Sequence, residues 1–144
     1  MYKIILHPTD LSESHYNIAE RAATLAKNMN AKLFLIHVIE PPTSLQLAQS
    51  LGFAEFDKPR KDDAQSVLKV LGDALDIPED QQIVEIGSIK KHILETASKI
   101  NCDLIAMGSH EPDVVPGFLG STAHAVVHYA TCDVLTIRNN LIQQ

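Results

Sequence analysis

The 144-residue chain contains few of the residues that mark several large classes of protein. Its two cysteines, Cys102 and Cys132, form no C-x-x-C pair, so the sequence indicates neither a metal site nor a disulfide framework and favours buried free thiols. No apolar run is long enough to cross a bilayer, and the residues after Met1 show no cleavage-site pattern. We therefore expect a soluble cytoplasmic protein without membrane contact.

Basic residues are also scarce. The 12 Lys and Arg against 18 Asp and Glu give a formal net charge of -6, and the pI is near 5.5. Surfaces that bind nucleic acid usually show clustered Lys and Arg, so this balance argues against a nucleic-acid partner. Small ligands and protein partners remain as candidates.

Two common nucleotide-binding motifs are missing from the sequence. There is no Gly-Lys-Ser or Gly-Lys-Thr, and no G-x-G-x-x-G follows the first apolar run, which disfavours P-loop hydrolysis and nicotinamide chemistry. Ser121 lacks the G-x-S-x-G elbow of a nucleophile, and the sequence places no carboxylate-histidine pair beside it. We predict that Ser121 is instead a helix N-cap and an anion ligand.

The main positive signal is the alternation of short apolar runs with helical periodicity. Together with a hydrophobic content of 45%, the length predicts one domain. Strands are expected over 3–7, 32–39, 82–86, 103–107 and 133–137, and helices over 14–28, 62–75, 89–100 and 121–129. Residues 43–60 suit either a short helix or a mobile flap. This order predicts an α/β fold, an open parallel sheet with helices on both faces.

Small and polar residues follow the first and fourth predicted strands. Ligands bind such sheets beyond the carboxyl ends of the strands, where the strand order reverses. If these two strands are neighbours, Pro8-Thr9-Asp10 meets Gly108-Ser109-His110 at that edge. Leu119-Gly120-Ser121-Thr122 then opens a helix whose amides, hydroxyls and dipole favour an anion. The sequence therefore predicts one phosphate-binding site made from both turns.

Several candidate residues have two interpretations each. Asp10 could cap the following helix or hold a ribose hydroxyl, and Val38 could be a core residue or offer main-chain groups to a base. His124 and His128 stand four apart on a predicted helix, which suits a metal site less well than two solvent-facing positions, since no cysteine completes the set. His110 is expected to donate to a phosphate or to order its loop.

The chain resembles the universal stress protein family over essentially its whole length. The resemblance rests on Ile4–Ser12, Leu35–Val38, Asp103–His110 and Val134–Arg138. It implies an adenine nucleotide alpha hydrolase-like fold, with a doubly wound, open five-stranded parallel sheet of order 3-2-1-4-5, in a single domain over residues 1–144. It also implies a homodimer through the last strand, Val134 to Ile137, where pairing would cover an exposed sheet edge.

The predicted nucleotide loop departs from the usual pattern of the family. Nucleotide-binding members usually show G-x2-G-x9-G-[ST], whereas Glu111 here replaces the second glycine and the loop from Gly108 to Gly120 is one residue shorter. The loop is similar to a branch that reads Ser-His-Arg-Pro-Asp and ends in Leu-Gly-Ser, with Glu111 in place of the arginine. A carboxylate there would repel phosphates unless it faces outward or shares a cation.

Carried over residue by residue, the resemblance implies that Asp10 contacts ribose, that the Val38 main chain contacts adenine, and that Met107 lines the base pocket. The loop residues would hold the ribose-phosphate portion. The cofactor-binding residues expected on this basis are Pro8, Thr9, Asp10, Val38, Met107, Gly108, Ser109, His110, Gly120, Ser121 and Thr122. No catalytic or metal-binding residue is expected.

The function expected from the resemblance is a regulatory dimer of the stress response that binds ATP or AMP, with or without Mg²⁺, and acts on unidentified protein partners. No general base or second basic residue is evident beside a transferring phosphoryl group, so we expect at most weak ATP hydrolysis or autophosphorylation. The alternative is a nucleotide-free dimeric interaction module in which Glu111 has weakened phosphate binding.

Overall fold

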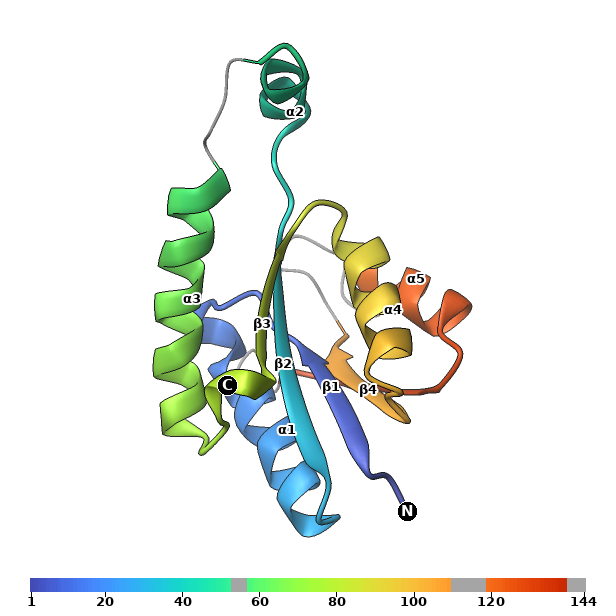
Figure 1. Ribbon diagram of the computed structural model, residues 1–144. Helices are drawn as coiled ribbons and strands as arrows, with labels where there is room; N and C mark the ends of the chain where they lie inside the picture. The colour runs from blue at the N-terminus through green and yellow to red at the C-terminus, as the bar shows by residue number, and fades with distance from the viewer. Residues whose placement is uncertain (53–56, 110–118, 140–144) are drawn as a thin grey trace.

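The computed structural model describes residues 1–52, 57–109 and 119–139. It shows a five-stranded parallel sheet with helices on both faces (Figure 1). The strands are β1 (Ile4–Pro8), β2 (Lys32–Ile39), β3 (Gln82–Ile86), β4 (Leu104–Gly108) and β5 (Asp133–Ile137). They lie in the order β3-β2-β1-β4-β5, and each neighbouring pair is parallel. The predicted fold class and strand order are confirmed, and β1 and β4 are central neighbours.

The helices divide between the two faces of this sheet. They are α1 (Tyr16–Asn28), α2 (Thr43–Ser50), α3 (Asp57–Ala74), α4 (Ile89–Lys99) and α5 (Ser121–Tyr129), with short 3-10 turns η1 (Glu13–His15) and η2 (Glu79–Gln81). Helices α1 and α3 cover one face and α4 and α5 the other, whereas α2 stands beyond the carboxyl end of β2 (Figure 1). None of the described helices is long and apolar enough to span a membrane.

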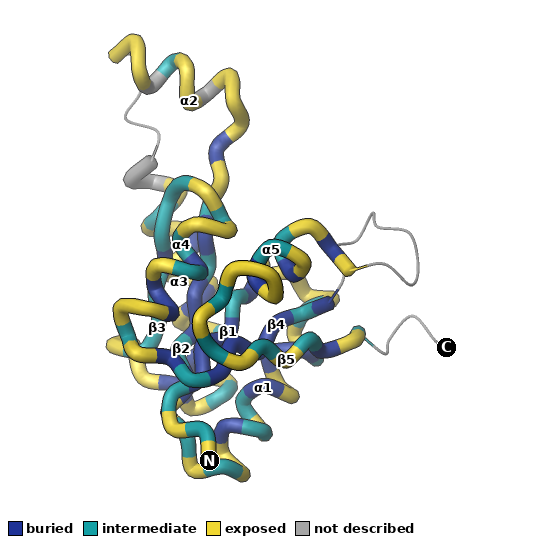
Figure 2. The backbone as a smooth tube through the Cα atoms, turned by 90° about the vertical axis from the view of Figure 1, so that its right-hand side faces the viewer, coloured by how far each residue is buried: buried dark blue, intermediate teal, exposed yellow. Residues whose placement is uncertain are grey.

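Both faces of the central strands are buried, which explains why the strands read as continuous apolar runs rather than as alternating ones. Ile5 belongs to the core cluster under α1 and α3, and its neighbour Leu6 to the cluster under α4 and α5. Both side chains are fully buried. Figure 2 shows the tube of the central strands largely in the colour of buried residues. The expected edge position of β3 is also confirmed.

Several predicted boundaries differ from the structure by one to five residues. The first strand extends to Pro8, because Thr9 N–H replaces the missing proline donor and bonds Ile36 O at 2.9 Å. The first helix starts with η1 and becomes α-helical only at Tyr16. The third helix begins at Asp57, five residues earlier than predicted, since Pro59 falls in its first turn, where no N–H is needed. Within 43–60, the short-helix alternative holds over Thr43–Ser50.

Candidate functional site

A pocket of about 290 Å³ lies at the carboxyl ends of β1, β2 and β4, beside the start of α5. This is the place where the strand order reverses between β1 and β4, and where doubly wound sheets bind their ligands. The lining residues are Pro8, Thr9, Asp10, His15, Ile36, His37, Val38, Ile89, Ile93, Met107, Gly108, Ser109, Gly120, Thr122 and Ala123.

Nine of the eleven residues nominated from the sequence line this pocket. They are Pro8, Thr9, Asp10, Val38, Met107, Gly108, Ser109, Gly120 and Thr122. His110 lies outside the described residues, as do Glu111 and the rest of the segment up to residue 118. Ser121 lines a separate surface hollow with Lys90 and His124 instead.

The predicted capping role of Ser121 is wrong. The N-cap of α5 is Gly120, with extended backbone angles of φ -60° and ψ 156°, and Ser121 is the first helical residue. One residue of offset turns the Ser121 side chain onto the helix face that carries His124, three positions on, because residues three apart share a face. The polar lining at this corner comes from Thr122 rather than from Ser121.

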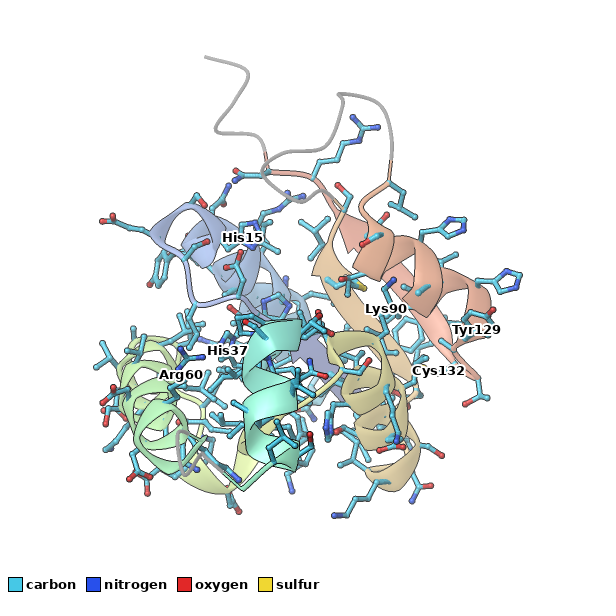
Figure 3. The ribbon with its side chains drawn as sticks, turned by 90° about the horizontal axis from the view of Figure 1, so that it is seen from above. His15, His37, Arg60, Lys90, Tyr129 and Cys132 are labelled. Carbon is cyan, nitrogen blue, oxygen red and sulfur yellow. The ribbon has the colours of Figure 1, made fainter. Side chains whose placement is uncertain are left out.

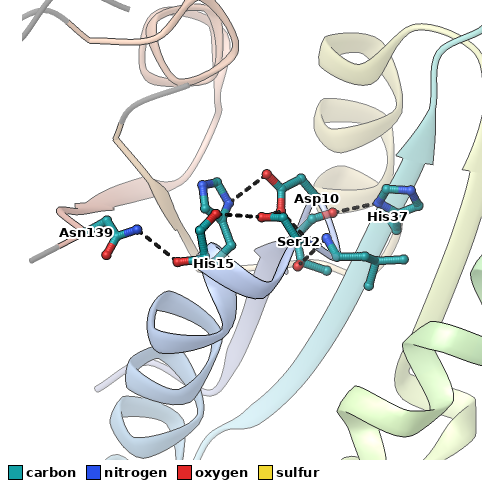
Figure 4. Close-up of polar contacts among 8 residues, drawn as sticks. Asp10, Ser12, His15, His37 and Asn139 are labelled. Atoms are coloured by element: carbon teal, nitrogen blue, oxygen red, sulfur yellow. Dashed lines mark hydrogen bonds and ion pairs between the residues drawn. The ribbon is translucent and has the colours of Figure 1, made fainter. Parts of the chain in front are cut away.

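Asp10 is held by a local network after β1 (Figure 4). Its Oδ1 accepts from Ser12 N–H at 2.8 Å and from Ser12 Oγ at 2.7 Å, and its Oδ2 lies 3.0 Å from His15 Nδ1. Burial acts to raise the pKa of the Asp10 carboxyl, but the hydrogen bonds from His15 and Ser12 outweigh it and hold that pKa well below its usual range. Asp10 is therefore an anion that orders the turn, and it caps neither η1 nor α1.

The turn that carries Asp10 is fixed by a second set of bonds. Leu11 has a φ of 64°, a left-handed conformation that is uncommon for a residue with a branched side chain. Thr9, 8% exposed, stabilises this conformation because its Oγ1 accepts the Leu11 N–H at 3.1 Å. The Thr9 carbonyl oxygen accepts from His37 Nδ1 at 2.8 Å, which joins the ends of β1 and β2. The pocket floor is thus tied together without a ligand.

Apolar side chains form much of the pocket wall. Val38, 8% exposed, is both a member of the core cluster and a lining residue, so the two interpretations of this position hold together. Ile36, Ile89, Ile93 and Met107 extend the same surface. A planar, weakly polar ring system suits such a wall, because its transfer from water is favourable wherever apolar surface is covered.

The β4 end brings backbone groups close to the pocket. A Cβ on Gly108 would lie 3.1 Å from Ile18 Cδ1 and 3.9 Å from His15 Cε1, so glycine permits close packing of β4 against α1. Gly120 N–H donates to Ser109 O at 2.9 Å and sets the start of α5 against the strand end. The first turn of a helix carries a partial positive charge, and here Thr122 and Ala123 of that turn line the pocket.

Charge is sparse around the pocket. Among the described lining residues, Asp10 is the carboxylate, and His15 and His37 are the groups able to carry positive charge. His124 and His128 stack on α5 with ring centroids 6.4 Å apart, outside this pocket. The part of the chain that the structure describes holds no cluster of three or more metal-ligating side chains.

Six lining residues were not nominated from the sequence, and they are His15, Ile36, His37, Ile89, Ile93 and Ala123. The four apolar ones lie in segments that were predicted only as a strand or a helix. His37 sits inside an apolar strand, and a histidine two positions before the strand end is a usable signal, since that end faces the pocket. No sequence spacing indicated His15, whose place in the pocket depends on its contact with Asp10.

Fold and site together define a doubly wound α/β domain with a small-molecule pocket at its switch point. The model of the universal stress protein family matches residues 1–138, and the chain therefore belongs to this family. Universal stress protein A homolog 2 of Coxiella burnetii is 36% identical over 139 residues, which cover 95% of each chain.

Solved structures share the same fold. That of the hypothetical protein MJ0577 superposes with a TM-score of 0.79 at 23% identity, over 96% of each chain. A universal stress protein crystallised in complex with cAMP gives a TM-score of 0.71 at 21% identity, over 96% of this chain and 98% of the other. The doubly wound fold with strand order 3-2-1-4-5 that the resemblance implies is the one these structures share with this chain.

Proposed function

We propose that this protein binds an adenine nucleotide, ATP or AMP, in the pocket at the β1-β4 switch point and acts as a cytoplasmic regulator of the stress response. One observation carries the proposal. The ends of β1, β2 and β4 and the start of α5, which are far apart in the sequence, supply nine of the nominated residues to one cavity. In this proposal, residues 1–144 form a single domain.

The pocket offers a separate environment to each part of the nucleotide. The apolar wall around Val38 and Met107 suits the adenine ring, and the Asp10 carboxylate in the same lining suits a ribose hydroxyl. The start of α5, with Gly120 and Thr122, suits the phosphates, because amides and helix dipole both favour an anion there. A volume of about 290 Å³ lies near the lower limit of small-molecule pockets, roughly 300 Å³.

The protein chemistry favours binding over turnover. Asp10, the carboxylate of the described lining, is engaged by Ser12 and His15, so it is poorly placed to take a proton from an attacking water. We therefore expect at most weak ATP hydrolysis or autophosphorylation. Regulation then comes from occupancy of the pocket, with ATP bound with or without Mg²⁺, and from unidentified protein partners.

Calorimetric titration with ATP, ADP and AMP, with and without Mg²⁺, tests the proposal. Thr122→Ala should weaken binding of a phosphate-bearing nucleotide roughly tenfold, the size of one hydrogen bond to a charged group. Thr24→Ala, an exposed threonine of α1 outside the pocket, is the matched control and should leave the affinity unchanged. Heat below detection for all three nucleotides at millimolar concentration would overturn the proposal.

The second candidate function is a nucleotide-free dimeric module. The observation that favours it is the absence of lysine and arginine from the described pocket lining, where phosphate charge would need compensation. If Glu111 has weakened phosphate binding, Glu111→Arg or Glu111→Gly should create or greatly improve ATP affinity. Glu20→Arg, an exposed position on α1, makes the same charge change and should not. Tight ATP binding by the wild type would remove the reason for this candidate.

A further inference from the structure

The pocket wall nearest to α1 contains an ion pair that the sequence did not reveal. His15 comes from η1 and lies between Asp10 and the end of β4. Its Nδ1 is 3.0 Å from Asp10 Oδ2, and its side chain is 18% exposed. Figure 3, which looks onto the carboxyl ends of the strands, shows His15 at one side of the sheet end and Lys90 at the other.

The partner of Nδ1 determines what the other ring nitrogen can do. Asp10 is an ionised carboxylate that only accepts hydrogen bonds, so Nδ1 carries the hydrogen and donates it. Nε2 is bonded to Cε1, the ring atom that lies 3.9 Å from the position of a Cβ on Gly108. Within residues 1–52, 57–109 and 119–139, the His15 ring is bonded through Nδ1, to Asp10. Nε2 is available at the side of the pocket where the phosphate-binding turns meet.

Titratable groups lie near His15 on several elements. Asp10 faces it from the β1 turn, and Glu13 stands two residues before it in η1. His7 of β1 is close enough for like charges to repel, but burial lowers the pKa of His7 to about 4, so this ring is neutral at physiological pH. His37 of β2 lines the same pocket and is tied to Thr9 O. Among these groups, the Asp10 carboxylate is the one that bonds the His15 ring.

We propose that His15, oriented by Asp10, is a phosphate-contact residue of this pocket, and that its protonated ring donates from Nε2 to the phosphate of a bound adenine nucleotide. The inference rests on the proposed function and adds that pH regulates the nucleotide affinity. Because Nδ1 already donates to Asp10, only the protonated ring can also donate from Nε2, so nucleotide affinity should rise as the pH falls. Asp10 then acts through His15 as well as, or instead of, contacting ribose directly.

A comparison of two ligands distinguishes the contribution of the phosphate from that of the nucleoside. Adenosine carries no phosphate, whereas cAMP carries a phosphodiester whose single charge does not change near neutral pH, so any pH effect belongs to the protein. For the wild type, cAMP should bind roughly tenfold more tightly at about pH 6 than at about pH 8, and adenosine equally at both. His15→Gln should abolish the cAMP difference, and His15→Lys should give tight binding at both pH values.

His128→Gln is the matched control, because His128 is an exposed histidine of α5 outside the pocket, and it should bind like the wild type. The wild type itself supplies a second readout. In ¹⁵N spectra, the Nε2 signal of His15 should shift to the protonated form on addition of cAMP and not on addition of adenosine.

The outcomes distinguish the two proposals. If adenosine and cAMP both bind, but cAMP affinity is independent of pH or of His15, the role of His15 is overturned and the nucleotide pocket stands. If neither adenosine nor any nucleotide binds, the proposed function fails, and the phosphate contact fails with it. A tight complex of the wild type with an unshifted His15 signal also overturns the role of His15.

Discussion

At the residue scale, His7 is the least expected side chain of the fold. It is a fully buried histidine in the middle of the sheet, with Nδ1 donating to Ala106 O at 2.7 Å. Its Nε2 is buried and has no hydrogen-bond partner among the described residues. Burial lowers the pKa of His7 from 6.5 to about 4, although the bond to Ala106 acts in the opposite direction.

This burial predicts acid sensitivity. Between pH 6.5 and about 4, the unfolded chain binds a proton at His7 that the folded chain excludes, so the free energy of unfolding falls as the pH falls. The shift in the His7 pKa corresponds to about 3 kcal/mol of the free energy of unfolding. This contribution is fully lost below the pKa of the folded state. His7→Phe should remove this part of the pH dependence. Urea unfolding of the wild type and of the variant at about pH 7 and about pH 5 measures this difference. The same fall in the free energy of unfolding in both proteins would contradict the assignment.

At the element scale, β5 is the exposed edge of the sheet next to β4. Leu135 is 41% exposed on this strand, and an unpaired apolar edge favours association with a second strand. We propose that two copies pair through Val134 to Ile137, as the resemblance implies. The edge position is observed, and the pairing is a prediction.

Leu135→Lys should therefore dissociate the dimer, because a lysine at a pairing edge opposes strand association. Sedimentation velocity at several protein concentrations measures the change. Val70→Lys on α3, at a site that is 70% exposed and distant from β5 in the sheet order, is the matched control and should remain dimeric. A wild type that sediments as a monomer at all concentrations would exclude this pairing.

Helix α2 contrasts with the packed helices. Its Leu47 and the following Leu51 are 61% and 64% exposed, and Figure 2 shows α2 mostly in the exposed colour beyond the sheet. Leu47→Ala should change the free energy of unfolding by less than about 0.5 kcal/mol. Leu68→Ala on α3, where the leucine is 1% exposed, should cost about 2–5 kcal/mol because it leaves a cavity. Equal losses in thermal or urea unfolding would show that α2 is packed in solution.

At the scale of the whole molecule, ligand binding and folding are linked. The pocket uses residues from Pro8 to Ala123, so it exists only in the folded chain. If ATP binds, ATP at about 100 times its dissociation constant should stabilise the fold by about 2.7 kcal/mol. Thermal unfolding with and without ATP measures this shift, and Thr122→Ala should reduce it at the same ATP concentration. An unchanged melting temperature at saturating ATP would contradict the linkage.

The sequence predicted the architecture well because continuous apolar runs and helical stripes depend on local spacing. The strand order came from the resemblance, since spacing alone does not say which strands are neighbours. Asp10 and Gly108 were found because both follow a strand directly. His15 and His37 were missed because their roles depend on contacts with Asp10 and Thr9, and the position of Ser121 was misjudged by a single residue at the start of α5.

The pocket takes its polar residues from positions just past the buried stretches of the strands, whereas Ile5 and Leu6 in the strand interior are fully enclosed. Substitutions at Asp10 or His15 therefore change the lining of the pocket and leave the sheet interior intact. Descendants of one ancestral domain can in this way diverge in ligand preference, or abandon ligands altogether, while the scaffold persists.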